Sequence, residues 1–288
     1  MKPTKKDLLS HSALTLPGLP RGKMPRMPNT AGVLIYSPIS CPAVTDEQIG
    51  QIEGDEPEFI TRHIHSDKLP AARQGFYRFG TTAGYAPKDA QLNPGRLSDI
   101  QEGRQLQAFR SRNGHFKRFA TAQGALTKVS PVGFEHDVVV HFKANDYCSC
   151  SSIGEFDPTR AGQLKARGNP DIGGFVTYNL RRLRLAIGEI VKETENISQM
   201  KVIGRQVTYG HKDLKWEVED SFDHDEQRDS LAIWLGITFV KSHLYQHEEE
   251  YRLVLSDPAK LGQLSEGTGY WQVTDARIAA AIVASGGF

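Results

Sequence analysis

Apolar residues in this chain gather in short runs separated by glycine, proline and polar residues, and most of the runs predict strands. β-branched and aromatic residues dominate them, and such side chains suit a pleated, half-buried surface. The expected strands cover residues 33–36, 76–79, 138–142, 174–178 and 251–255, with shorter ones at 202–203 and 206–209.

Helical spacing appears in two longer segments. After Asn179, a typical N-cap residue, apolar side chains recur on one helix face at Leu180, Leu183, Ile187, Ile190 and Val191. Residues 225–236 predict a second helix, whose apolar face holds Leu231, Trp234 and Leu235. A short last helix is expected at 275–284. Residues 83–125 and 154–174 lack a clear period and predict loops, with short helices in the first of these segments.

The chain divides into an expected N-terminal arm and one domain. Residues 1–32 carry lysines and arginines against a single acidic residue, Asp7, and several prolines disfavour regular structure there. Residues 33–288 are expected to form a single catalytic-type domain. Its strands and helices mix without regular βαβ alternation, which is typical of an α+β fold.

Composition excludes several classes of function. A net charge of +1 excludes a polyanion binder that acts through its whole surface, so any nucleic-acid contact needs a local patch. No apolar run approaches the ~20 residues needed to cross a bilayer, and we expect no membrane insertion. The three cysteines form no disulfide framework, and Cys148 and Cys150 lack the second ligand pair of a zinc site, so no metal is expected. This cysteine usage suggests a cytoplasmic protein, or one delivered into a target cell's cytosol by a specialised secretion system.

The segment His247–Leu255 carries the most suggestive chemistry. In an extended chain, alternate side chains share a face, so Glu248, Glu250 and Arg252 are expected to point one way and Glu249 and Tyr251 the other. Two carboxylates on one face repel each other and are seldom paired without a use. Such a pair can hold sugar hydroxyls and stabilise the oxocarbenium-like transition state of glycosidic bond cleavage.

Three elements follow in order along the chain: Arg78 in a strand, the serine-rich segment 148–152, and Glu248-x-Glu250. This order resembles that of the ADP-ribosyltransferases. The resemblance implies a split mixed or antiparallel sheet with flanking helices, and NAD as the substrate. By the same resemblance, cofactor binding falls to Arg78, Tyr77, Ser149 and Ser151. Glu250 would be the catalytic carboxylate and Glu248 the residue on the acceptor side.

Three further segments, 76–80, 173–180 and 241–253, look like parts of a large bacterial family of uncharacterised domains, and this likeness spans residues 76–284. Together the two resemblances imply an ADP-ribosyltransferase-type enzyme that cleaves the nicotinamide–ribose bond. The acceptor can be a protein, a nucleic acid or water, and the setting a toxin, an effector or an antiphage defence enzyme.

Two other functions stay open at this point. The first is a nucleic-acid-acting enzyme or binding module that uses the segment 109–119. This segment interleaves basic and aromatic residues, which suits phosphate contacts and base stacking, although its phenylalanines can equally enter the core. The chain can also be a non-catalytic interaction domain in which the glutamates pair with Arg252 and Lys241.

Overall fold

The computed structural model describes residues 34–38, 43–85, 103–113, 116–121, 124–129, 138–167, 170–223, 226–265 and 267–288. The fold is α+β, with largely antiparallel sheets and helices. The chain forms two compact units: residues 1–36, 107–141 and 215–225 belong to the smaller, and 37–106, 142–214 and 226–288 to the larger. The sequence led us to expect one domain over 33–288, and the expected arm at 1–32 lies outside the described residues.

The larger unit is built on an eight-stranded sheet. Six strands follow the order β10-β15-β8-β2-β9-β17, and β3 pairs with both β8 and β16. The strands are β2 (Phe59–His65), β3 (Phe76–Thr81), β8 (Tyr147–Ile153), β9 (Ile172–Asn179), β10 (Lys201–Gln206), β15 (Glu250–Ser256), β16 (Trp271–Thr274) and β17 (Ile282–Gly287). A short parallel pair, β11 (Thr208–Tyr209) with β14 (Val240–Lys241), accompanies the sheet.

The sheet forks at β8. One edge of β8 pairs throughout with β15, whereas the other edge pairs with β3 at Tyr147 and Cys148 and with β2 at Ser152 and Ile153. Between these pairings, residues 149–151 have no strand partner on that edge among the described residues. β2 continues alongside β9, while β3 continues alongside β16, so the two branches separate from a common strand.

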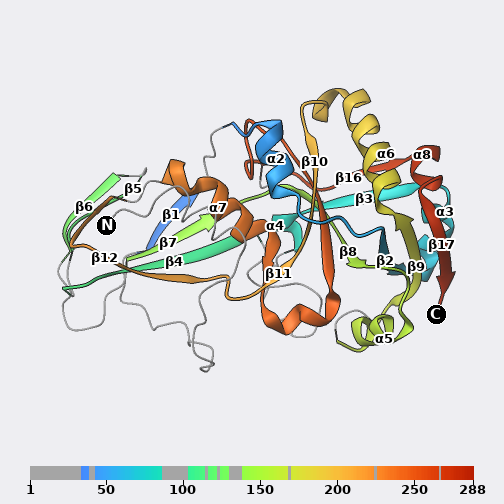
Figure 1. Ribbon diagram of the computed structural model, residues 1–288, viewed down its shortest axis with the longest axis horizontal. Coiled ribbons are helices and arrows are strands. Elements are labelled where there is room, and N and C mark those ends of the chain that lie inside the picture. Colours follow the sequence, from blue (N-terminus) through green and yellow to red (C-terminus); the bar gives the residue numbers. More distant parts are fainter. Residues whose placement is uncertain are drawn as a thin grey trace. The chain divides into compact units, whose positions relative to one another are not determined.

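The core of the larger unit lies between one face of this sheet and two helices. α6 (Leu180–Glu193) and α8 (Ala276–Ala279) lie side by side (Figure 1). The predicted helix at α6 is confirmed, because Asn179 caps it by accepting from the Arg182 amide and its five predicted apolar residues are all buried. Opposite the helices, the sheet contributes aromatic and aliphatic side chains from every branch, among them Tyr77, Tyr178 and Leu253.

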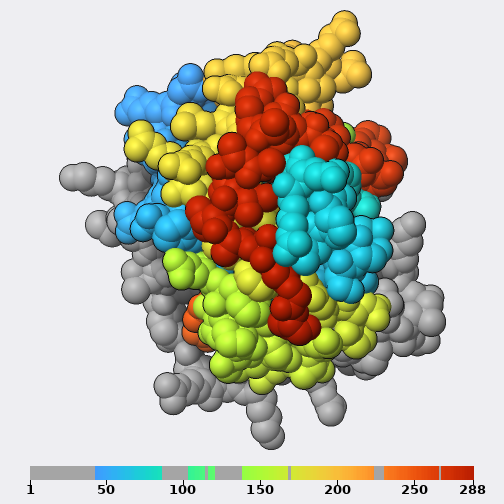
Figure 2. Space-filling model, turned by 90° about the vertical axis from the view of Figure 1, so that its right-hand side faces the viewer, coloured from blue at the N-terminus to red at the C-terminus, as the bar shows by residue number. Residues whose placement is uncertain are grey.

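The remaining helical elements connect the strands. They are α2 (Asp46–Ile52), η1 (Ser66–Lys68), α3 (Leu69–Arg73), α4 (Thr82–Tyr85), α5 (Pro158–Arg167), η2 (Glu195–Ile197), α7 (Glu226–Phe239) and η3 (His243–Glu248). Figure 2 shows β17, in red, crossing the surface beside the cyan segment that contains α3, and the two elements are in contact. None of the helices described is long and apolar enough to span a membrane.

The smaller unit holds two sheets. One has the order β1-β7-β4-β12, from β1 (Leu34–Pro38), β7 (Val138–Lys143), β4 (Arg104–Ser111) and β12 (Leu214–Val218). The other has the order β13-β5-β6, from β13 (Ser221–Asp223), β5 (Phe116–Thr121) and β6 (Gly124–Val129). Four phenylalanines pack together in this unit: Phe109, Phe116, Phe119 and Phe222.

Three local predictions were wrong. Residues 83–125 were expected to lack strands, but β4 and β5 lie there. In β4 every second residue is buried, and three of these four are the polar Gln105, Gln107 and Ser111, which hid the period of two. The expected loop at 154–174 contains α5, and the last helix is only α8, after which the chain continues as β17.

Candidate functional site

Glu250 begins β15, a strand in the interior of the larger sheet. β15 lies between β8 and β10, and all seven of its residues are buried. Glu250 is therefore a carboxylate in a place that normally holds aliphatic side chains, where an ion needs compensating partners. Its backbone is also fixed, because its N–H donates to the Tyr209 hydroxyl at 2.8 Å and its carbonyl accepts from the Val207 amide.

The segment before β15 brings Glu248 to the same place as Glu250. Glu248 ends η3, and Glu249 follows with a left-handed φ of 43°, the only non-glycine positive φ among the described residues. Such a conformation costs a residue with a β-carbon about 1 kcal/mol, so the surrounding contacts must hold it. The expectation that Glu248, Glu250 and Arg252 lie together is confirmed. However, strand alternation alone was expected to place Glu248 beside Glu250. In the structure, the 3₁₀ turn η3 and the left-handed residue Glu249 place it there.

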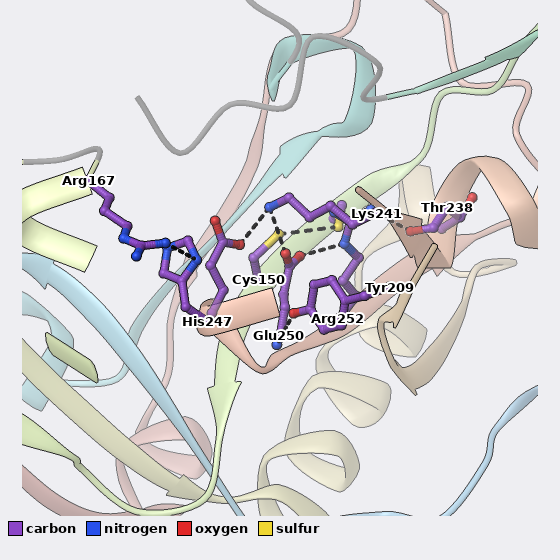
Figure 3. A network of polar contacts seen from close by, with 10 residues as sticks. Cys150, Arg167, Tyr209, Thr238, Lys241, His247, Glu250 and Arg252 are labelled. Atoms are coloured by element: carbon purple, nitrogen blue, oxygen red, sulfur yellow. Dashed lines mark hydrogen bonds and ion pairs between the residues drawn. The ribbon is translucent and has the colours of Figure 1, made fainter. Parts of the chain in front are cut away.

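Two cations hold the two carboxyl groups (Figure 3). The Lys241 ammonium donates to Glu248 Oε2 at 2.6 Å and to Glu250 Oε2 at 2.9 Å. Arg252 Nε donates to Glu250 Oε1 at 2.5 Å, and the guanidinium also donates to the Thr238 carbonyl. The side chains of all four charged residues are at most 8% exposed. We call Lys241, Glu248, Glu250 and Arg252 the charge cluster.

The two carboxyl groups of the charge cluster have opposite protonation tendencies. Burial raises the pKa of Glu250, but Arg252 and Lys241 outweigh it and hold that pKa well below the ordinary range. For Glu248, burial dominates, and together with the neighbouring Glu250 it raises the pKa to about 8 despite the attraction of Lys241. Glu248 Oε1 is buried and has no hydrogen-bond partner among the residues described. The site therefore presents one firmly ionised carboxylate next to one carboxyl group that titrates near neutrality.

Cys150 lies against the charge cluster from the neighbouring strand. The β15–β8 register pairs Arg252 with Cys150 and Glu250 with Ser152, and directly opposed side chains share a face of the sheet. A hydrogen bond with Cys148 and burial raise the pKa of Cys150 well above its usual range, so Cys150 is held as a thiol. The thiol lies close enough to Glu250 to help keep the pKa of that carboxyl group low. Cys150 is thus a polar neighbour of Glu250 and a poor nucleophile.

Of the residues expected to bind the cofactor, only Arg78 shares the face of Glu250. Arg78 is two residues from Gly80, which pairs with Cys148, so Arg78 and Cys150 lie on the same face. Its side chain is exposed, and the guanidinium stacks over Tyr270 at 4.0 Å from the ring centroid. Arg78 makes no ion pair with a carboxylate in the described part of the chain.

Ser149, Ser151 and Tyr77 point to the opposite face of the sheet. Ser151 pairs with Tyr251 and Ser149 with Leu253, which are core residues. The Ser149 hydroxyl donates to the Tyr77 hydroxyl at 3.1 Å. The strand register therefore places these three residues, which were expected to bind the cofactor, on the face of the sheet opposite Glu250. The sequence motif alternates Cys-Ser-Cys-Ser, and the cysteines, not the serines, face the glutamate.

The basic and aromatic segment 109–119 has its aromatics in the core. Phe109, Phe116 and Phe119 are at most 3% exposed, so they are not available to stack on bases. Basic residues of this segment pair with nearby acids: Arg112 with Glu219 at 2.8 Å, and Arg118 with Asp223. Among the described residues, no group of three or more His, Cys, Asp or Glu side chains is arranged to hold a metal ion.

Sequence reasoning missed two contributors to the site, Tyr209 and Cys150. Tyr209 lies 41 positions before Glu250 and reaches it from β11, so no local pattern links them. Cys150 could have been found from the alternation of β8, once the register against β15 was known. Comparisons of the chain with protein-family models, with curated proteins and with solved structures find no match.

Proposed function

We propose that this chain is an NAD-dependent enzyme of the ADP-ribosyltransferase type, which cleaves the nicotinamide–ribose bond and passes ADP-ribose to a macromolecular acceptor or to water. One observation carries the proposal. At the start of the central strand β15, the charge cluster holds an ionised Glu250 beside a titratable Glu248, and both carboxyl groups accept from the Lys241 ammonium. Carboxyl groups whose pKa values are driven apart are typical of sites that need one permanent charge and one exchangeable proton.

Glu250 supplies the charge. As the C–N bond to nicotinamide breaks, the bonding electrons leave with the nicotinamide and positive charge develops on the ribose carbon. A carboxylate fixed in a dry environment stabilises that charge more strongly in the transition state than in the ground state. Arg252, Lys241 and Cys150 all favour the ionised form of Glu250, so it needs no proton loss before the reaction.

Glu248 supplies the proton exchange. When an acceptor hydroxyl, amine or water attacks the ribose carbon, it must lose a proton. The pKa of Glu248, about 8, lies close to neutrality, where a general base is most effective. The fork at β8 adds support, because the resemblance seen in the sequence implies a split sheet, and the sheet divides beside the strand that carries Glu250.

A second candidate function rests on the same contacts. Both oxygens of Glu250 are already occupied, Oε1 by Arg252 and Oε2 by Lys241. If these bonds persist in the working protein, the charge cluster is a structural element of a non-catalytic interaction domain. The two candidates make different predictions for Glu250→Gln. Only an enzyme would lose catalytic activity when the negative charge of Glu250 is removed.

The test measures nicotinamide release from NAD by the purified protein, with and without cell lysate. Glu250→Gln should reduce release by about a hundredfold or more, in the range seen when a single transition-state electrostatic contact is removed. Glu249→Gln is the matched control, since Glu249 is the adjacent carboxylate and its side chain is 56% exposed. Dependence on lysate would indicate transfer to an acceptor, and independence would indicate hydrolysis.

Folding of the variants is checked in parallel, because breaking a buried ion pair costs about 3–5 kcal/mol. Glu250→Asp retains the charge but retracts the carboxylate, so it should stay folded and still lose most of the release. No release by the folded wild type under any condition, with Glu250→Gln altering only the free energy of unfolding, would favour the interaction domain instead.

A further inference from the structure

Arg62 is a half-buried cation that has no carboxylate partner among the described residues. It follows the two residues at which β2 pairs with β8, and so it lies where β2 leaves the fork. Its guanidinium stacks over the Tyr77 ring at 4.3 Å from the centroid and donates to the Arg78 carbonyl at 3.3 Å. Within the described ranges, no Asp or Glu forms an ion pair with it. Two other arginines of the larger unit, Arg184 and Arg277, each pair with glutamates.

Side chains that carry hydroxyl groups share the face of Arg62, which is opposite to that of Glu250. Arg62 shares that face with Ile60, which pairs with Ile153 and Tyr178. The Tyr178 hydroxyl hydrogen bonds to Arg62, and the Tyr77 hydroxyl accepts from Ser149. We call Arg62, Tyr77, Tyr178, Ser149 and Ser151 the fork wedge, since they share one face of the sheet at the fork and come from β2, β3, β9 and β8.

Ser151 provides a second, independent sign of an absent ligand. The residue is only 6% exposed, and its hydroxyl lies beside the Tyr77 phenol without meeting the geometry of a hydrogen bond to any described group. A buried hydroxyl without a partner costs about 1–3 kcal/mol, so such a group usually serves a ligand or a bound water. It belongs to the three residues of β8 that neither β2 nor β3 covers.

The charge on Arg62 persists in this environment. Burial lowers the pKa of Arg62, but Tyr77, Tyr178, Tyr85 and Cys150 together more than offset it, so the guanidinium stays charged. Neutral hydroxyls can orient an anion but cannot balance a full positive charge. The fork wedge therefore combines one cation that has no carboxylate partner in the described ranges with four hydroxyls that can donate or accept hydrogen bonds.

We infer that the fork wedge binds a phosphate group, with the Arg62 guanidinium as its principal ligand and the Ser151 hydroxyl as a further donor. The planar guanidinium matches two phosphate oxygens at once, and serine and tyrosine hydroxyls complete such sites. Arg62 is partly accessible, so a ligand can reach it from solvent. The phosphate can be free or part of a nucleotide diphosphate. The inference does not depend on the proposed NAD chemistry, because Glu250 lies on the other face of the sheet.

The alternative explanation is that Arg62 has a structural role only, in which it links β2 to β3 by its hydrogen bond to the Arg78 carbonyl. Calorimetric titration separates the two explanations, with inorganic phosphate, pyrophosphate and ADP-ribose as probes at constant ionic strength. The variants are Arg62→Gln, Ser151→Ala and the control Arg205→Gln. Arg205 is a suitable control because it is also a strand arginine that donates to a main-chain carbonyl, that of Ile52, and has no carboxylate partner in the described chain.

Wild type and Arg205→Gln should bind at least one probe, and Arg62→Gln should bind it about tenfold or more weakly, as expected for the loss of a charged hydrogen bond. Ser151→Ala removes no existing bond, so it should fold normally and bind several-fold more weakly. If Arg62→Gln does not fold, Arg62→Lys and Ser151→Ala decide the matter by the same titration.

Absence of binding by the wild type, or equal affinity in wild type, Ser151→Ala and the folded Arg62 variant, would overturn the inference. Binding of inorganic phosphate alone would indicate a free-phosphate site, whereas tighter binding of ADP-ribose would indicate a nucleotide diphosphate. Arg62-dependent binding without any nicotinamide release would retain the fork wedge and reject the proposed enzyme.

Discussion

Asp146 offers a quantitative test of how burial of a carboxyl group changes its pKa and the pH dependence of stability. The residue is 2% exposed, and none of the Lys, Arg or His side chains described here forms an ion pair with it. Its carboxylate accepts from Trp234 Nε1 at 2.7 Å, from the Ser256 hydroxyl at 2.5 Å and from the Gly262 amide at 3.1 Å. Burial nevertheless dominates and raises the pKa of Asp146 from 3.8 to about 6.

The sign and size of the effect follow from that pKa. Between pH 3.8 and about 6 the folded protein keeps a proton that the unfolded chain has lost. The contribution of Asp146 to stability is therefore complete below pH 3.8 and declines as the pH rises through 6. A difference of about two pKa units corresponds to about 3 kcal/mol of unfolding free energy.

Asp146→Asn removes this titration. Its amide nitrogen would face the Trp234 or Ser256 donor, which costs about 1–3 kcal/mol at every pH. In urea unfolding at intervals from pH 4 to pH 8, the variant should start less stable than wild type. It should then gain about 3 kcal/mol relative to wild type by pH 7.

The matched control is Asp55→Asn, because Asp55 is an exposed aspartate. Subtracting its pH profile removes the general effect of losing one negative charge. A difference between Asp146→Asn and wild type that stays constant from pH 4 to pH 8 would refute the reasoning. It would mean that the three donors fully offset the burial of the carboxylate.

Three smaller predictions concern other parts of the larger unit. Burial raises the pKa of Glu248 to about 8, so wild type should lose stability relative to Glu248→Gln as the pH rises from 4.5 to 8 in chemical denaturation, and a flat difference would contradict this. A β-carbon at Gly204 would lie 2.6 Å from the Tyr251 hydroxyl. Gly204→Ala should therefore lower the melting temperature, at a cost of about 1–3 kcal/mol of unfolding free energy. Adding Tyr251→Phe to this variant should restore part of the lost stability, and no restoration would mean that the predicted clash does not occur. Asn179→Ala should cost about 1 kcal/mol by removing the α6 cap, and unchanged thermal unfolding would argue against the cap.

Local patterns were sufficient where one segment decides its own structure. The α6 helix was predictable because its cap and its apolar face both lie within residues 179–191. β15 was predictable because Tyr251 and the apolar run from Leu253 to Leu255 are residue types that favour strands. The strands β4 and β5 were not, because the glutamines and serine that β4 buries resemble solvent-facing residues in sequence.

The candidate site divides in the same way. The sequence located Glu248, Glu250 and Arg252, since they lie within five residues and their charges stand next to an apolar run. It did not show which side of the 148–152 segment faces them, because a shift of one residue in strand register exchanges the two faces. The structure places Cys150 beside Glu250, with Ser149 and Ser151 on the far side.

The sequence by itself determined the α+β class, the α6 helix and the acidic strand, because these follow from residue type and local spacing. Only the tertiary structure decided that Lys241 and Arg252 occupy both oxygens of Glu250. It also decided that the sheet forks at β8, where Arg62 has no carboxylate partner among the described residues. These contacts join residues from separate strands. The register and pairing that bring them together depend on burial over the whole sheet, which no short segment encodes.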